Sequence, residues 1–288
     1  MTDRRVRLAV RRAGLLAAAL TLLLSALASG CSQEQTSAAA RQRLVLATTT
    51  STQDSGLLDA LVPAFEAEHP GYAVEVIAVG TGEALRLGRQ KDADVLLVHA
   101  PEEEAAFVAA GYGTERRDVC YNRFVIVGPA GDPAGVREAA SAPDALARIA
   151  GRQAPFASRG DGSGTHTKER ALWGAAGVEP GGAWYLVTGQ GMGETLKIAS
   201  EKQAYALTDE ATFLAMRDAL DLAALFDRDA ALRNQYGVVV VAGARNERGA
   251  RDFADWICGN DGQALIGRFG ADRFGRPLFT PNGGGDAQ

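Results

Sequence analysis

Three short segments of the chain are rich in hydroxyl side chains and glycine: residues 48–51 (TTTS), 80–82 (GTG) and 158–165 (SRGDGSGT). Each follows an apolar run and precedes a helical pattern, so each is expected to be a turn from a strand into a helix. The N-terminus of a helix presents free amide donors and the positive end of its dipole. Hydroxyls add donors that can rotate, and Arg159 adds a planar, permanently charged guanidinium. This combination favours a site for a small, highly charged oxyanion.

The elements that position these turns are predicted to form a parallel α/β sheet. Apolar runs at residues 44–47, 74–79 and 93–98 alternate with stretches whose apolar residues recur at helical spacing, as is typical of such a sheet. The first helix is expected to be capped by Asp54 and Ser55. Because the carboxyl ends of parallel strands meet at one edge of a sheet, we expect the three turns to lie together.

The start of the chain is expected to direct export and anchoring rather than to form part of the folded domain. Residues 1–30 combine a basic beginning with an apolar run at 15–27, which is too short for a comfortable membrane span and typical of a signal peptide. Residues 27–31 (LASGC) resemble the lipobox of bacterial lipoproteins, so Cys31 is the expected lipidation site. Residues 31–42 lack apolar periodicity and predict a flexible linker. The expected location is the periplasm or the cell surface, with the protein anchored to the membrane by its lipid.

Composition excludes several classes of protein. With 30 Lys and Arg against 35 Asp and Glu, the net charge is −5, which argues against a nucleic-acid-binding protein. The three histidines are scattered, and no Cys or carboxylate cluster has metal-ligand spacing, so neither a metal nor a cofactor is expected. In an oxidising compartment Cys120 and Cys258 could form a disulfide, but two buried, unpaired cysteines are the favoured expectation. The charged runs 102–104 and 116–117 are expected to be solvated faces.

Longer blocks of sequence indicate a family. These blocks are LATTTSTQDSGLLDALVPAFE, IAVGTGEALRLGRQKDADVLLVHAPEEEAAFVAAGYG, YNRFVIVGP, SRGDGSGTHTKE, GQGMGETLKIA and YALTD. They resemble the tungstate-binding lipoproteins of bacterial ABC importers, in family order over most of residues 44–245. The resemblance implies a type II periplasmic binding-protein fold, in which two α/β lobes close on a tetrahedral oxyanion, here tungstate or the related molybdate. It also implies a permease and an ATPase as partners, and binding without covalent chemistry.

The resemblance and the turns together give the expected site, which contains no catalytic residue. The expected ligand-binding residues are Thr49, Thr50, Ser51, Thr81, Gly82, Arg159, Ser163, Gly164 and Thr165. Gly82 and Gly164 would let backbone amides approach the ligand closely. Thr49 is the weaker candidate, because its position also suits a core-facing side chain. Asp54 and Asp161 are expected to brace loops, since a carboxylate facing a dianion would repel it.

The expected domain organisation is a monomer with two lobes. Lobe 1 comprises residues 43–121 and 244–288, and lobe 2 comprises residues 122–243. The sequence departs from the family pattern where Gly162 replaces an Asp, Glu210 an Arg, and Gln235 a Pro. The loss of a carboxylate at Gly162 is expected to change the rigidity of the site loop. The anion at Glu210, where the family has a cation, is expected to change the contacts made on lobe closure.

Other functions stay open on the sequence alone. The nearest is a receptor for phosphate or sulfate. Phosphate keeps a proton near neutral pH and would benefit from an acceptor, whereas these turns offer mostly donors. A hydrolase using Ser163 and His166 lacks a third group in a suitable motif and a nucleophile-elbow pattern. A sensor or adhesion lipoprotein would act without transport partners.

Overall fold

The computed structural model describes residues 40–284 of the 288-residue chain. The predicted signal peptide, the lipidation site at Cys31 and most of the predicted linker lie outside the described residues. From Arg41 onward the chain forms one compact unit. None of the helices in the described part combines the length and hydropathy needed to cross a bilayer.

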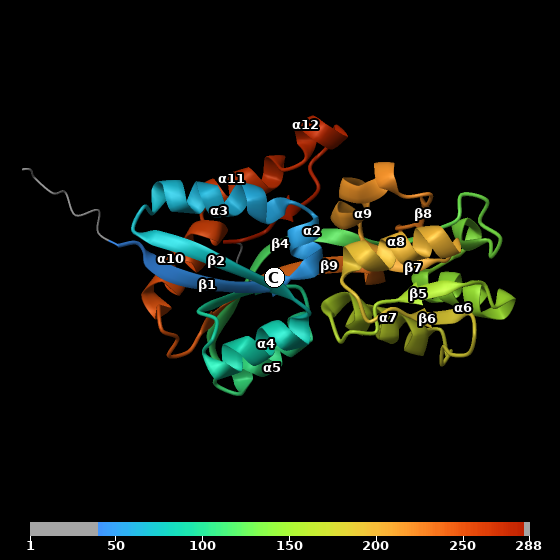
Figure 1. Ribbon diagram of the computed structural model, residues 1–288, viewed down its shortest axis with the longest axis horizontal. Helices are drawn as coiled ribbons and strands as arrows, with labels where there is room; N and C mark the ends of the chain where they lie inside the picture. The colour runs from blue at the N-terminus through green and yellow to red at the C-terminus, as the bar shows by residue number, and fades with distance from the viewer. Residues whose placement is uncertain (1–39, 285–288) are drawn as a thin grey trace, which may run out of the picture. The chain divides into compact units, whose positions relative to one another are not determined.

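The first sheet is centred on β1 (Gln42–Thr49), which pairs in parallel with β2 (Tyr72–Val79) and with β3 (Val95–Val98). β9 (Arg233–Val241) is antiparallel both to β3 and to β4 (Gly113–Gly128). The other elements of this part are α3 (Leu57–Glu68), α4 (Thr81–Gln90), α5 (Pro101–Ala109), α10 (Glu247–Cys258), α11 (Asn260–Arg268), α12 (Ala271–Phe274) and β10 (Thr280–Pro281). Figure 1 shows α3 and α11 on one side of this sheet, and α4 and α5 on the other.

Both faces of this sheet are covered, which explains the continuous apolar run of β1. Side chains alternate between faces along a strand, and Leu44 and Leu46 pack in one core with residues of α3 and α10. Val45 and Ala47 pack in another core with residues of α4 and α5. A strand buried on both sides is apolar at every position rather than at alternate ones.

The second sheet uses the far end of β4. Residues 124–128 pair antiparallel with β7 (Ala206–Asp209) and with β8 (Ala223–Phe226). β5 (Phe156–Ser158) and β6 (Tyr185–Val187) form a separate two-stranded parallel sheet. The other elements here are α6 (Ala142–Arg152), α7 (Gly164–Ala175), α8 (Met192–Lys202), α9 (Glu210–Met216) and the 3-10 turns η1 (Val136–Glu138), η2 (Arg217–Ala219) and η3 (Ala230–Leu232).

The hydrophobic core is divided between two lobes that share β4. Val119 and Cys120 of this strand belong to the core around β1, whereas Phe124 and Ile126 belong to the core around α6. The predicted two-lobed α/β fold is therefore confirmed. Each lobe contains both parallel and antiparallel strand pairs. Residues 236–241 of β9 pack with the first lobe, although they lie in the range predicted for lobe 2, and the boundaries stay a prediction.

The first helix begins earlier than the sequence pattern indicated. A short helix α2 (Thr50–Asp54) follows β1 directly, and Thr49 caps it because its Oγ1 accepts from the amide of Thr52. Gly56, at φ +79°, then interrupts the chain before α3. The predicted cap of the helix that carries Leu57 is confirmed for Ser55, whose Oγ accepts from the Leu57 amide at 3.2 Å, but not for Asp54, which ends α2 and accepts from the amide of Gly193 instead.

The charged runs are not both solvated. Glu104 is fully buried, where it accepts from Arg116 Nε at 2.6 Å and from the amide of Ala100 at 2.6 Å. The prediction of a solvated face was wrong for this carboxylate, because the rotation of about 100° per residue along α5 turns Glu104 toward β4 while Glu102 stays exposed. Cys120 and Cys258 are both buried and free, as predicted.

Candidate functional site

The three hydroxyl-rich turns meet in the structure. The amide of Gly164, the first residue of α7, donates to Thr81 Oγ1, in the first residue of α4, at 3.0 Å. Arg159, in the turn after β5, donates from Nη2 to Thr50 Oγ1 at 3.0 Å. Segments that are far apart in the sequence are thus joined by direct hydrogen bonds. The turns after β1 and β2 share one sheet edge as predicted, but the third turn follows β5 of a separate two-stranded sheet, so it meets them across the lobes rather than along the same edge.

Arg159 lies at the centre of this contact. Its side chain is 1% exposed, and Nη2 also donates to Asp161 Oδ2 at 2.5 Å. The other two guanidinium nitrogens, Nε and Nη1, are buried without a hydrogen-bond partner among residues 40–284. Because a buried donor without a partner costs free energy, this guanidinium is prepared to bind an acceptor.

Three hydroxyls around Arg159 already act as acceptors. Thr50 accepts from Arg159, Thr81 from the amide of Gly164, and Ser163 from the amide of His166 at 3.3 Å. A hydroxyl that accepts in this way still has its own hydrogen to donate. Thr165 Oγ1 is buried and has no partner within the described part of the chain. The site therefore offers hydroxyl donors rather than acceptors.

Glycines allow the two lobes to approach closely here. A Cβ on Gly164 would lie 3.1 Å from both the carbonyl oxygen of His99 and Thr81 Oγ1, which is tighter than most real contacts. A Cβ on Gly82 would lie 3.6 Å from the carbonyl oxygen of Gly162, which is an ordinary contact. Gly162 has φ +69° with open space around it, so backbone conformation rather than crowding favours glycine at this departure from the family pattern.

Thr49 and Ser51 gather around a residue that the sequence did not single out. His99 Nε2 lies 3.0 Å from Ser51 Oγ and 3.1 Å from Thr49 Oγ1, and its Nδ1 lies 2.9 Å from Asn234 Oδ1. Burial, and secondarily the charge of Arg159, lowers the pKa of His99 to about 4, so the imidazole is neutral near pH 7. The one available signal was its place directly after β3, at the same sheet edge as the turn after β1.

The two aspartates near the site brace its loops, as expected. Asp161 accepts from Arg159 and, through Oδ1, from the amide of Ser163 at 3.1 Å. Asp54 accepts from the amide of Gly193 at the start of α8 at 3.1 Å, and burial raises its pKa. The second contact joins a lobe 1 helix to a lobe 2 helix.

His166 is poorly arranged for a hydrolase. Its Nδ1 accepts from the amide of Gly162 at 3.0 Å, so the hydrogen of a neutral imidazole is on Nε2. Neither nitrogen is then free to take a proton from Ser163, whose Oγ instead caps α7. Residues 40–284 also contain no group of three His, Cys, Asp or Glu placed to hold a metal ion.

The two remaining departures from the family pattern have local partners. Glu210 forms an ion pair with Arg276. Gln235 donates from Nε2 to the carbonyl oxygen of Cys120 at 2.9 Å and accepts from Asn282 at 3.0 Å. Both side chains are thus accommodated by lobe 1 residues outside the three turns.

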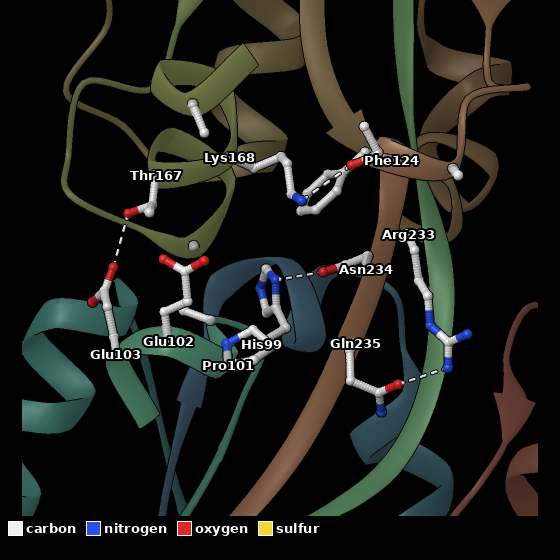
Figure 2. A pocket seen from close by; sticks show the side chains of 15 residues that line it. His99, Pro101, Glu102, Glu103, Phe124, Thr167, Lys168, Arg233, Asn234 and Gln235 are labelled. Atoms are coloured by element: carbon white, nitrogen blue, oxygen red, sulfur yellow. Dashed lines mark hydrogen bonds between the residues drawn. The ribbon is translucent and has the colours of Figure 1, made fainter. Parts of the chain in front are cut away.

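A pocket of about 320 Å³ lies beside the turns, lined by residues of α5, α7 and β9 (Figure 2). Of the predicted site residues its lining includes Gly164, and His99 forms part of its wall. Figure 2 shows Glu103 and Thr167 facing each other across it, and Thr167 Oγ1 donates to Glu103 Oε1 at 2.9 Å. This bond is a further contact between the lobes.

Comparison with known proteins identifies the family. Residues 32–261 match the model of the PBP superfamily domain. The chain belongs to this superfamily. It is 45% identical over 275 residues to the tungstate-binding protein TupA of Peptoclostridium acidaminophilum, and the match covers 91% of this chain and 95% of that protein. Within the superfamily it therefore belongs with the TupA proteins.

Two solved structures of this family share the fold. The tungstate ABC transporter protein of Geobacter sulfurreducens is 48% identical, with a TM-score of 0.72, and the match covers 79% of this chain and 98% of that one. The tungstate-binding protein TupA of Desulfovibrio alaskensis G20 is 42% identical, with a TM-score of 0.68 and coverage of 84% and 99%. These relatives are named as binding and transport proteins, and none of the three is named as an enzyme.

Proposed function

We propose that the protein is an extracytoplasmic receptor that captures tungstate, and the related molybdate, and delivers it to an ABC importer. The observation that carries this proposal is the set of donors around Arg159. Two of its guanidinium nitrogens are buried without a partner within the described residues, and the hydroxyls of Thr50, Thr81 and Ser163 keep their hydrogens. Such a set suits a fully deprotonated tetrahedral dianion.

The oxyanion is bound, in this proposal, where the three turns meet. Its ligands are Thr50, Ser51, Thr81, Gly82, Arg159, Ser163, Gly164 and Thr165. Thr49 belongs to the hydroxyl cluster behind Ser51. Capture is noncovalent, and lobes 1 and 2 close on the anion by a hinge motion in which β4 and β9, the strands that cross between the lobes, take part.

Phosphate is the nearest competing ligand, since hydrogen phosphate has the same shape. Near neutral pH it carries a hydrogen that needs an acceptor. The carboxylate of Asp161, which contacts Arg159, is already engaged by Arg159 and by the amide of Ser163. A hydrogen phosphate would therefore place its hydroxyl against donors, which disfavours it.

The same proposal includes the location, the oligomeric state and the protein partners of the receptor. The mature protein is a monomer, anchored through a lipid on Cys31 at the membrane surface in the periplasm or on the cell exterior. Its protein partners are the permease and the ATPase of the importer. The relatives named as tungstate transporter and tungstate-binding proteins support the importer as partner, whereas the lipid on Cys31 rests on the sequence motif alone.

Calorimetric titration with tungstate, molybdate, sulfate and phosphate under the same conditions tests the ligand. Tungstate and molybdate should bind, and both should bind more tightly than phosphate. Tighter binding of sulfate or phosphate than of tungstate would overturn the assignment.

A further inference from the structure

A closed ring of buried polar groups runs through the site. Ser51 Oγ contacts His99, His99 contacts Asn234, and Asn234 Nδ2 donates to Asn122 Oδ1 at 2.8 Å. Asn122 reaches Asp209 over 3.5 Å. Thr212 then closes the ring, because its amide donates to Asp209 Oδ1 at 2.9 Å and its Oγ1 donates to the carbonyl oxygen of Ser51 at 3.0 Å.

The members of this ring come from both lobes. Ser51 is in α2 and His99 directly follows β3, whereas Asp209 and Thr212 lie at the start of α9. Asn234 and Asn122 lie on β9 and β4, where those strands pass from one lobe to the other. Each of the six residues is at most 5% exposed. The ring therefore joins the predicted oxyanion site to the crossing strands without passing through water.

The ring also fixes the direction of its hydrogen bonds. A carboxylate only accepts, so Asn122 turns its amide nitrogen to Asp209 and its oxygen to Asn234. Asn234 then presents its oxygen to His99, which must donate from Nδ1. A neutral imidazole carries one hydrogen, so Nε2 is left as an acceptor facing Thr49 and Ser51.

The single acceptor, His99 Nε2, lies within hydrogen-bond distance of two hydroxyls, those of Thr49 and Ser51. Thr49 Oγ1 already accepts from the amide of Thr52 and lies 2.7 Å from the Thr52 hydroxyl. Its own hydrogen can therefore be donated to Nε2. Thr49 Oγ1 also lies 3.0 Å from Ser51 Oγ, but when it accepts from both the amide and the hydroxyl of Thr52 it has no lone pair left for Ser51. The hydroxyl hydrogen of Ser51 is then left for another acceptor.

We propose that His99 is a positioning residue of the oxyanion site, which acts through Ser51: its Nε2, held as an acceptor by the buried ring, takes the hydrogen of Thr49, so that the Ser51 hydroxyl beside it keeps its own hydrogen for the oxyanion. This inference rests on the proposed function. It assigns Thr49 to support of the site rather than to direct contact. It also makes the placement of Ser51 depend on β4 and β9, the strands shared by the lobes.

Nitrogen NMR of the full wild-type chain tests the first half of the proposal. At pH 7 the signals of His99, identified from their loss in His99→Gln, should show Nδ1 protonated and Nε2 unprotonated, both without ligand and with tungstate. A hydrogen on Nε2 in either state would overturn the proposal.

A double-mutant cycle on tungstate affinity tests the second half. Ser51→Ala and His99→Phe should each weaken binding by about 2- to 12-fold, the effect of one hydrogen bond. In the double variant the second change should add less than about twofold, because His99 acts through Ser51. His99→Gln keeps an acceptor and should recover part of the loss. Additive losses would mean that His99 is merely structural.

A matched control uses Thr165→Val, which removes a hydroxyl of the same site that has no partner within residues 40–284. Combined with His99→Phe, its loss should be additive. Coupling as strong as with Ser51 would show a general loosening of the site and overturn the proposal.

The titration of the wild type with tungstate separates the proposed function from the role of His99. No tungstate binding there refutes the proposed function together with this inference, whereas normal binding with additive losses refutes only the role of His99.

Discussion

Arg159 Nη2 lies 2.5 Å from Asp161 Oδ2, and this ion pair orients a guanidinium that is 1% exposed. The pair occupies only one of the three guanidinium nitrogens, because Nη2 is also the atom that donates to Thr50. The carboxylate thus holds the cation in place without using all of its donors. Two predictions concern this geometry and the closely packed turn beside it.

Replacing Arg159 should cause the largest loss of tungstate affinity of any single site residue. A hydrogen bond to a charged group contributes about 1.5–3 kcal/mol, so Arg159→Ala should weaken binding roughly ten- to over a hundredfold. Arg159→Lys keeps the charge but not the planar fork, so its tungstate affinity should fall between those of the wild type and of Arg159→Ala. Thr81→Ala removes a neutral donor and should cost about 0.5–1.5 kcal/mol. Titration calorimetry measures all three.

Thermal unfolding without ligand is the control for these variants. All three should unfold near the wild-type temperature, because removing the guanidinium also removes the free-energy cost of its two buried, unpartnered nitrogens, which offsets the lost pair with Asp161. Near-wild-type binding by Arg159→Ala would move the site elsewhere. A collapse of ligand-free stability would instead make the pair with Asp161 structural.

Gly164→Ala should weaken binding by keeping the turns apart. The new Cβ would lie 3.1 Å from Thr81 Oγ1 and from the carbonyl oxygen of His99, and overpacking of this kind costs about 1–3 kcal/mol. Gly174→Ala, in the same helix, meets no atom within 4 Å and should leave affinity unchanged while stabilising α7 slightly. Equal affinities of the two variants would show that close contact of the turns is not needed.

Stability should depend on His99 at mildly acidic pH. Because burial lowers its pKa from 6.5 to about 4, the unfolded chain binds a proton more readily than the folded chain between these values. This group's contribution is therefore present above about pH 6.5 and lost as the pH falls to about 4, at up to about 1.4 kcal/mol per pH unit.

Urea unfolding of the wild type and of His99→Gln at pH 7, 6 and 5 checks this dependence. The wild type should lose more free energy of unfolding on acidification than the variant, because glutamine does not titrate. Parallel pH curves for the two proteins would contradict the assigned pKa.

Lipid anchoring can be tested by fractionation. Cys31→Ser should move the protein from the membrane to the soluble fraction, because the thiol that receives the lipid is gone. Cys258→Ala, which alters a buried cysteine of the folded unit, should stay with the membrane. Unchanged fractionation of Cys31→Ser would refute the lipobox interpretation.

Sequence reasoning could predict what depends on local pattern and sheet geometry. Apolar runs such as 44–47 predicted buried strands, and the carboxyl-edge rule predicted that the turns after β1 and β2 would share an edge. The turn carrying Gly164 meets the turn carrying Thr81 for another reason, because it follows β5 of a separate sheet and approaches from the other lobe. Sequence reasoning could not predict the role of His99, which touches Ser51 across 48 residues of sequence, because that contact depends on how β1 and β3 are aligned. Nor could it predict which glutamate of a charged run faces Arg116, since that depends on the rotation of α5.

The two cysteines of the described unit have a consequence for how the protein can be made. Both Cys120 and Cys258 are buried thiols, and neither forms a disulfide. Folding of residues 40–284 therefore requires no oxidant, and reducing agents should not destabilise the folded unit. The unit can mature in a reducing cytoplasm as well as in an oxidising compartment, so recombinant production does not depend on export.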